Sequence, residues 1–102
     1  MSRRFLVTGG AGFIGSNYVA RLLKRGEQVT IYDNLSRAGA QMNLMWLRHE
    51  FGSDSVHLIQ ADVRDADALR RAARDADVIV HLAGQVAVTT SVTEPRNDFE
   101  IN

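Results

Sequence analysis

The chain has 102 residues, enough for one small domain over residues 1–102, and its 45% hydrophobic and 24% charged residues are typical of a globular protein. Its 12 Lys and Arg residues balance 12 Asp and Glu, so no net charge favours nucleic acid or an anionic membrane as a partner. The chain has no cysteine, which excludes disulfides, a thiolate nucleophile and a Cys-based zinc site, and we expect no metal site.

The first predicted element is a short strand over residues 4–7. Its run Phe5-Leu6-Val7 has no polar alternation, as expected for a parallel strand that is buried on both faces. The run is too short for a signal peptide, because two glycines follow almost at once, and no segment reaches the length of a membrane span. We therefore expect a cytoplasmic protein without a membrane partner.

A glycine-rich stretch, Thr8-Gly9-Gly10-Ala11-Gly12-Phe13-Ile14-Gly15, follows this strand. Gly10, Gly12 and Gly15 give G-x-G-x-x-G, and Gly9 in place of Gly10 gives G-x-x-G-x-x-G. In a dinucleotide-binding turn, one glycine permits the sharp turn, one lets the pyrophosphate approach the backbone, and one lets helix and strand pack closely. The N–H groups that begin the next helix then face the phosphates. A tight surface turn is the alternative for such a run taken alone.

The elements after the glycines favour dinucleotide binding. Apolar residues recur at helical spacing over residues 13–24, Gly26 ends this helix, and a second strand is predicted over residues 28–32. Asp33 follows, close to the distance of about 20 residues at which a carboxylate accepts hydrogen bonds from the adenosine ribose. Asp33 favours NAD over NADP, because a carboxylate repels a 2′-phosphate. For Arg37, pairing with a phosphate, stacking on adenine and a solvated loop charge all stay open.

The middle of the chain predicts a second helix over residues 41–50 and a third strand over residues 56–60. Within the helix, Met42, Met45 and Trp46 are predicted to be packing groups, because such a cluster is more often core than part of a cofactor site.

Two acidic residues follow the third strand, at the end where open parallel sheets bind ligands. Asp62 is a candidate acceptor for the adenine amino group, with Val63 packing nearby, and a loop or cap role is the alternative. Asp65 is the better candidate for the N-cap of an exposed helix over residues 66–74.

A fourth strand is predicted over residues 78–80, and small residues at Ala83 and Gly84 would let the nicotinamide half of a cofactor lie against the backbone. His81 is predicted to be structural rather than an acid–base group, and residues 86–91 are predicted to form a loop. A last helix is predicted from near Pro95. Strands and helices thus alternate, which predicts an α/β fold of the Rossmann type. Its parallel sheet has strand order 3-2-1-4, helices on both faces, and is truncated.

The whole chain resembles the amino-terminal third of extended short-chain dehydrogenases/reductases, the group of NAD-dependent nucleotide-sugar epimerases and dehydratases. Four motifs carry the resemblance, in this order: Thr8-Gly9-Gly10-Ala11-Gly12-Phe13-Ile14-Gly15-Ser16, Tyr32-Asp33-Asn34-Leu35-Ser36-Arg37, Ala61-Asp62-Val63-Arg64-Asp65 and His81-Leu82-Ala83-Gly84.

The resemblance implies NAD as the cofactor and a set of residues that hold it. By position, Gly9, Gly12, Phe13, Ile14 and Gly15 would hold the pyrophosphate, and Asp33, Asn34, Ser36 and Arg37 the adenosine ribose side. Asp62 and Val63 would flank adenine, Leu82, Ala83, Gly84 and Gln85 the nicotinamide half, and Asn102 would approach the cofactor from the last helix.

Residues 39–47, 84–91 and 98–102 are similar to the branch of this family that epimerises C2 of CDP-linked dideoxyhexoses for lipopolysaccharide O-antigen. This similarity implies an enzyme whose NAD takes hydride from a sugar carbon and returns it to the other face of a keto intermediate. A nucleotide-sugar 4-epimerase, a 4,6-dehydratase and a non-catalytic NAD-binding module stay open as alternatives.

The chain departs from the family in its acid–base centre, a Ser/Thr with a Tyr-x-x-x-Lys helix. Tyr18 is followed four positions later by Leu22, and Tyr32 by Ser36, so we assign no catalytic residue and expect an amino-terminal fragment that is inactive alone. Its fourth strand is expected to be an exposed edge. We therefore expect a homo-oligomer, or bound NAD, to support its stability.

Overall fold

The computed structural model of the chain describes residues 2–82 and 89–91. Its elements, in chain order, are β1 (Arg4–Thr8), α1 (Phe13–Lys24), β2 (Gln28–Tyr32), α2 (Ala40–Phe51), β3 (Val56–Ile59), α3 (Ala66–Ala73), β4 (Val78–His81) and β5 (Thr89–Ser91). The helix predicted near Pro95 lies outside the described residues, as do Ala83, Gly84, Gln85 and Asn102. No helix in the described part of the chain is both long and apolar enough to cross a membrane.

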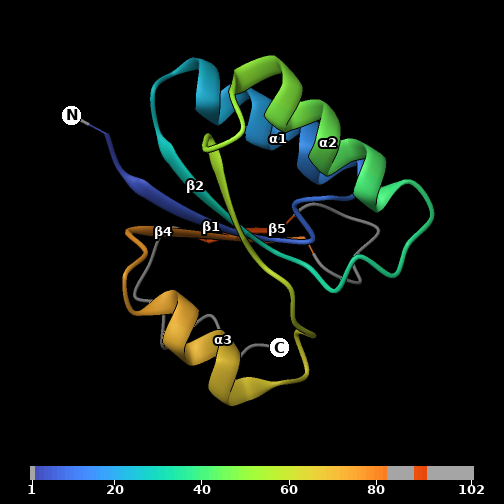
Figure 1. Cartoon of the computed structure of the whole chain (residues 1–102). Helices are drawn as coiled ribbons and strands as arrows, with labels where there is room; N and C mark the ends of the chain where they lie inside the picture. The colour runs from blue at the N-terminus through green and yellow to red at the C-terminus, as the bar shows by residue number, and fades with distance from the viewer. Residues whose placement is uncertain (1, 83–88, 92–102) are drawn as a thin grey trace.

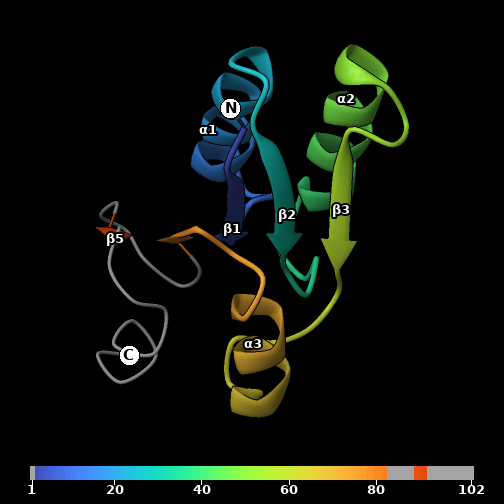
Figure 2. The same ribbon diagram turned by 90° about the vertical axis from the view of Figure 1, so that its left-hand side faces the viewer.

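The sheet confirms the predicted Rossmann-type order. Its strands lie in the order β3-β2-β1-β4-β5, and the first four are parallel. Val7 in the central strand β1 pairs with Ile31 of β2 on one side and with Val80 of β4 on the other. Because the four strands are parallel, their carboxyl ends meet at one edge of the sheet (Figure 2).

Strand β5 corrects two predictions. Residues 86–91 were expected to form a loop that leaves β4 as an open edge, but β5 pairs with β4 in antiparallel register, with Thr90 opposite Val80. An unpaired strand edge presents free N–H and C=O groups that readily accept a further strand. The β-branched residues Thr89 and Thr90 suit an extended backbone, so this short segment is able to supply that strand.

The helices cover both faces of the sheet, with α1 and α2 on one face and α3 on the other (Figure 1). Alternate residues of β1 enter two separate cores. Phe5 and Val7 pack in the core under α1 and α2, whereas Leu6 packs with Tyr32, Ile79 and residues of α3. This arrangement explains why β1 is apolar throughout, since both of its faces are buried.

The outer face of α2 corrects another prediction. Met42, Met45 and Trp46 were predicted to pack in the core, but their side chains are 75%, 68% and 43% exposed. The buried face of the helix is instead formed by Leu44 and Leu47, which lie on the opposite side of the helical turn. The apolar residues of α2 therefore cover nearly the whole helix circumference, and their spacing alone does not identify the face that meets the sheet.

Two carboxylates hold the amino-terminal end of β1 to its neighbours. Glu27, just before β2, accepts a hydrogen bond from the Arg3 backbone N–H at 2.8 Å, and this bond lowers the pKa of the Glu27 carboxyl. Asp77, just before β4, accepts one from the Arg4 backbone N–H at 2.8 Å, which likewise lowers the pKa of Asp77. These contacts fix the start of β1 at the edge of the sheet opposite to the glycine-rich turn.

We expect these carboxylates to make the fold acid-sensitive. Because their pKa values are lowered on folding, their stabilisation is present above the ordinary values of 4.5 and 3.8 and is lost as the pH falls through the lowered values. The urea midpoint should fall between pH 7 and pH 3, and the fall should be smaller in the double variant Glu27→Gln, Asp77→Asn. The exposed Asp54→Asn variant is the control and should behave like the parent chain. An equal fall in all three proteins would contradict this account.

Candidate functional site

Three glycines of the turn between β1 and α1, Gly9, Gly10 and Gly15, occupy positions where a side chain would be strained. Gly9 has φ 73°, in the left-handed region, and its N–H donates to the Tyr32 carbonyl at 2.9 Å, which ties the turn to β2. A Cβ on Gly15 would lie 2.2 Å from the Gly9 carbonyl oxygen, so α1 approaches the turn more closely than any side chain allows. A Cβ on Gly10 would lie 2.8 Å from the Ile31 side chain.

Gly12 differs from Gly10 and Gly15, because a Cβ there would make a single and milder close contact. A Cβ there would meet only the Gly9 carbonyl oxygen, at 3.3 Å. Gly12 is the N-cap of α1 and supplies no capping side chain, and the first turn of α1 contains no acidic residue. The first N–H groups of the helix, at Phe13 and Ile14, therefore have neither a capping side chain nor a competing carboxylate beside them, and both residues are exposed. This geometry fits the pyrophosphate of a dinucleotide.

Asp33 lies at the carboxyl end of β2, against the glycine-rich turn. One of its carboxylate oxygens accepts a hydrogen bond from the Ala11 N–H at 3.1 Å, and the other accepts from the Leu35 N–H at 2.8 Å. A carboxylate has about four acceptor sites, so each oxygen of Asp33 retains capacity for a further donor. A fixed acceptor pair beside a phosphate-binding turn fits the two hydroxyls of an adenosine ribose.

The loop after Asp33 is exposed and carries the other residues predicted for the ribose side. The Asn34 side-chain oxygen accepts a hydrogen bond from the Ser36 N–H at 3.0 Å, which closes a small turn. Arg37 is exposed, and its carbonyl accepts from the Ala40 N–H at the start of α2.

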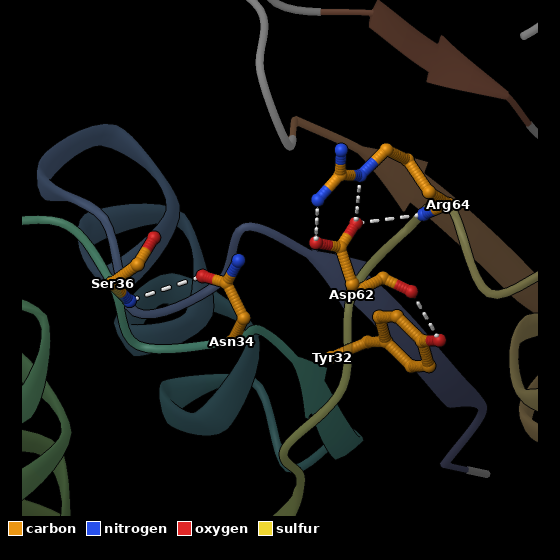
Figure 3. A network of polar contacts seen from close by, with 5 residues as sticks. All are labelled: Tyr32, Asn34, Ser36, Asp62 and Arg64. Carbon is orange, nitrogen blue, oxygen red and sulfur yellow. Dashed lines mark hydrogen bonds and ion pairs between the residues drawn. The ribbon is translucent and has the colours of Figure 1, made fainter.

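Asp62 follows β3 and lies in a network of polar contacts (Figure 3). Both of its carboxylate oxygens contact the Arg64 guanidinium, and these contacts lower the pKa of Asp62 to about 2. The Tyr32 hydroxyl donates to the Asp62 carbonyl at 2.8 Å, which joins the ends of β2 and β3. Val63, predicted to lie beside adenine, packs in part against the core under α3. Asp65 caps α3 as predicted, accepting from the Ala68 N–H at 3.1 Å.

A buried polar contact joins the ends of β1 and β4. Thr8 and His81 lie opposite each other in the sheet, and the Thr8 hydroxyl is 2.7 Å from the His81 Nδ1. The same hydroxyl accepts a hydrogen bond from the Leu82 N–H at 3.0 Å. These contacts support the prediction that His81 is structural, and they fix the backbone of Leu82 at the end of β4.

Sequence reasoning missed several residues that hold the site together. Asn43 in α2 donates through Nδ2 to the Ala11 carbonyl at 2.8 Å, and so links this helix to the glycine-rich turn. A signal for it exists, because Asn43 is a polar residue beside the buried positions Ala40, Leu44 and Leu47 of this helix. Thr8 and Arg64 belong to quoted motifs but were given no role of their own.

The comparisons with known proteins agree with this geometry. The family profile described as GDP-mannose 4,6 dehydratase matches residues 6–102. CDP-paratose 2-epimerase of Salmonella typhi is 44% identical over 101 residues, which cover 97% of this chain and 29% of that protein. UDP-glucose 4-epimerase of Neisseria meningitidis serogroup B is 40% identical over 102 residues, which cover 98% of this chain and 30% of that protein. The chain thus spans less than a third of the length of these curated relatives.

A solved structure shares both sequence and fold with the chain. The Bordetella bronchiseptica enzyme WbmG, crystallised in complex with NAD, is 30% identical and superposes with a TM-score of 0.68. The match covers 83% of this chain and 26% of that one. The fold described above is therefore shared with a protein of known structure.

Proposed function

The chain belongs to the family whose profile is described as GDP-mannose 4,6 dehydratase, and from this premise we propose that it is the NAD-binding part of a nucleotide-sugar epimerase. The observation that carries the proposal is the uncapped start of α1 at Gly12 beside the fixed carboxylate of Asp33. A pyrophosphate needs the first, and a free ribose 2′-hydroxyl needs the second.

Each side of the proposed cofactor has its own residues in this chain. The N–H groups of Phe13 and Ile14 hold the pyrophosphate, Asp33 accepts from the ribose hydroxyls, and Asp62 accepts from the adenine amino group. When bound, NAD supplies the hydride acceptor and donor of the reaction. The task of these residues is to orient the dinucleotide so that its nicotinamide half lies along the chain that leaves β4 after Leu82.

We assign the sugar by similarity, to C2 of a CDP-linked dideoxyhexose. Support comes from the Salmonella typhi 2-epimerase, which shares a larger fraction of identical residues than the 4-epimerase reported above. The 40% identity with that 4-epimerase favours, as a second candidate, epimerisation at C4 of a UDP-linked hexose. The test uses a longer protein that contains this chain. Conversion of CDP-paratose but not of UDP-glucose would support the C2 assignment, and conversion of UDP-glucose but not of CDP-paratose would support the C4 assignment.

The acid–base step in this family needs a Tyr-x-x-x-Lys motif, and neither tyrosine of this chain begins one. Neither Tyr18 nor Tyr32 is followed by lysine at the fourth position, so we propose that the 102-residue chain binds NAD without epimerising a sugar. Self-association remains part of the proposal, because a small parallel sheet buries a limited core.

Thermal unfolding with added dinucleotide tests the proposal. NAD at 100 times its Kd should stabilise the chain by about 2.7 kcal/mol and raise Tm, since only the folded turn binds it. NADP should have a smaller effect because of Asp33. Nicotinamide mononucleotide, which lacks the adenosine half, is the control and should leave Tm nearly unchanged. An unchanged Tm at saturating NAD would refute the proposed function.

A further inference from the structure

Arg64 donates three hydrogen bonds to the Asp62 carboxylate, one from its backbone and two from its exposed side chain. Its backbone N–H donates to Oδ1 of Asp62 at 2.9 Å, its Nε donates to the same oxygen at 3.1 Å, and its Nη2 donates to Oδ2 at 3.0 Å (Figure 3). The Arg64 side chain is 88% exposed. An exposed ion pair contributes little to stability, so a structural role alone gives little reason for this arrangement.

The contacts leave the carboxylate of Asp62 with a defined direction for a further donor. Of about four acceptor sites, the two on Oδ1 and one on Oδ2 are taken by Arg64. The Asn34 side chain, which also lowers the pKa of Asp62 through a side-chain hydrogen bond, lies on the side that Arg64 leaves open (Figure 3). The remaining acceptor site on Oδ2 therefore faces the end of β2, and an adenine amino group would replace the Asn34 amide as its donor.

We propose that Arg64 is a positioning residue for adenine recognition, which fixes the Asp62 carboxylate so that its remaining acceptor site receives the 6-amino group of adenine. This inference rests on the proposed function. Without Arg64, the carboxylate would rotate about its side-chain bonds and meet water as readily as the base. Arginine suits this role because its planar fork contacts both carboxylate oxygens at once, which a lysine ammonium does not do.

The test compares NAD with nicotinamide hypoxanthine dinucleotide, in which a carbonyl replaces the 6-amino group. The parent chain should bind NAD at least about tenfold more tightly, because the analogue turns an acceptor toward the carboxylate. In Arg64→Met this ratio of Kd values should fall to about threefold or less, and in Arg64→Lys to a value between the two. Arg70→Met is the matched control, since Arg70 pairs with Asp67 on exposed α3, and it should keep the full ratio.

A second readout follows the carboxylate itself. In Arg64→Met, the pKa of Asp62 measured by carbon-13 NMR should rise from about 2 toward its ordinary value of 3.8. If the parent chain binds neither dinucleotide, the proposed function fails and the inference with it. If it binds NAD and discriminates, but Arg64→Met keeps the ratio or Arg64→Lys restores it fully, only the inference is overturned. A raised pKa of Asp62 in Arg64→Met, together with an unchanged ratio of the two Kd values, would likewise overturn only the inference.

Discussion

Replacement of Gly15 by alanine is expected to abolish NAD binding and to destabilise the fold by about 3 kcal/mol. The added Cβ would lie 2.2 Å from the Gly9 carbonyl oxygen and 2.9 Å from the Gly10 Cα. Both neighbours are backbone atoms of the turn, so relief requires α1 to move away from β1. Urea unfolding monitored by circular dichroism measures the loss of stability, and calorimetry measures the loss of binding.

Gly12→Ala is the matched control for this substitution. Its φ of −71° suits any residue, and its Cβ would meet only the Gly9 oxygen at 3.3 Å, so the turn needs to shift by only a few tenths of an ångström and should lose less stability than with Gly15→Ala. Its methyl group would stand where we place the pyrophosphate, and NAD affinity should therefore fall. If Gly15→Ala were as stable as Gly12→Ala, this would contradict the inference that α1 lies too close to the turn for a side chain at position 15.

Replacement of Asp33 by asparagine is expected to weaken NAD binding about 10- to 100-fold, the range of one or two hydrogen bonds to a charged group. Binding of NADP should weaken less, because the carboxylate that repels its 2′-phosphate is removed. The ratio of the Kd for NADP to the Kd for NAD should therefore fall. Calorimetric titration with both dinucleotides measures this ratio.

Asparagine at position 33 also places an amide where the carboxylate accepts from Ala11 or Leu35, so some stability should be lost. Asp54→Asn, in the exposed turn before β3, separates a general effect of lost charge from the effect at the site. A lower ratio of the NADP to the NAD Kd in Asp33→Asn, but not in Asp54→Asn, supports the assignment of Asp33 to the adenosine ribose. An unchanged ratio would remove Asp33 from the cofactor site.

Local signals explain why much of the fold was predictable. The helix over residues 13–24 and the strand over residues 28–32 were predicted with the bounds that the structure has. Glycine and apolar spacing determine both elements within a short stretch of chain. The position of Asp33 follows from the same signals, because a residue that ends a parallel strand must lie at the ligand-binding edge.

The features that were missed depend on contacts between distant residues. Strand β5 forms because β4 presents a free edge, which the sequence of residues 86–91 does not reveal. The exposure of Met42 and Trp46 depends on which face of α2 meets the sheet, and apolar residues occupy both faces. The contact of Asn43 with Ala11 spans 32 residues and joins α2 to the glycine-rich turn, so the place of Asn43 beside buried residues indicates a contact but does not identify its partner.

Calorimetric titration of the unmodified chain with NAD and with NADP tests the central claim most directly. The account predicts one NAD bound per chain with a Kd lower than that of NADP, because Gly12 leaves room for the pyrophosphate and Asp33 accepts from a free 2′-hydroxyl. Absence of heat with either dinucleotide, or tighter binding of NADP than of NAD, would contradict it.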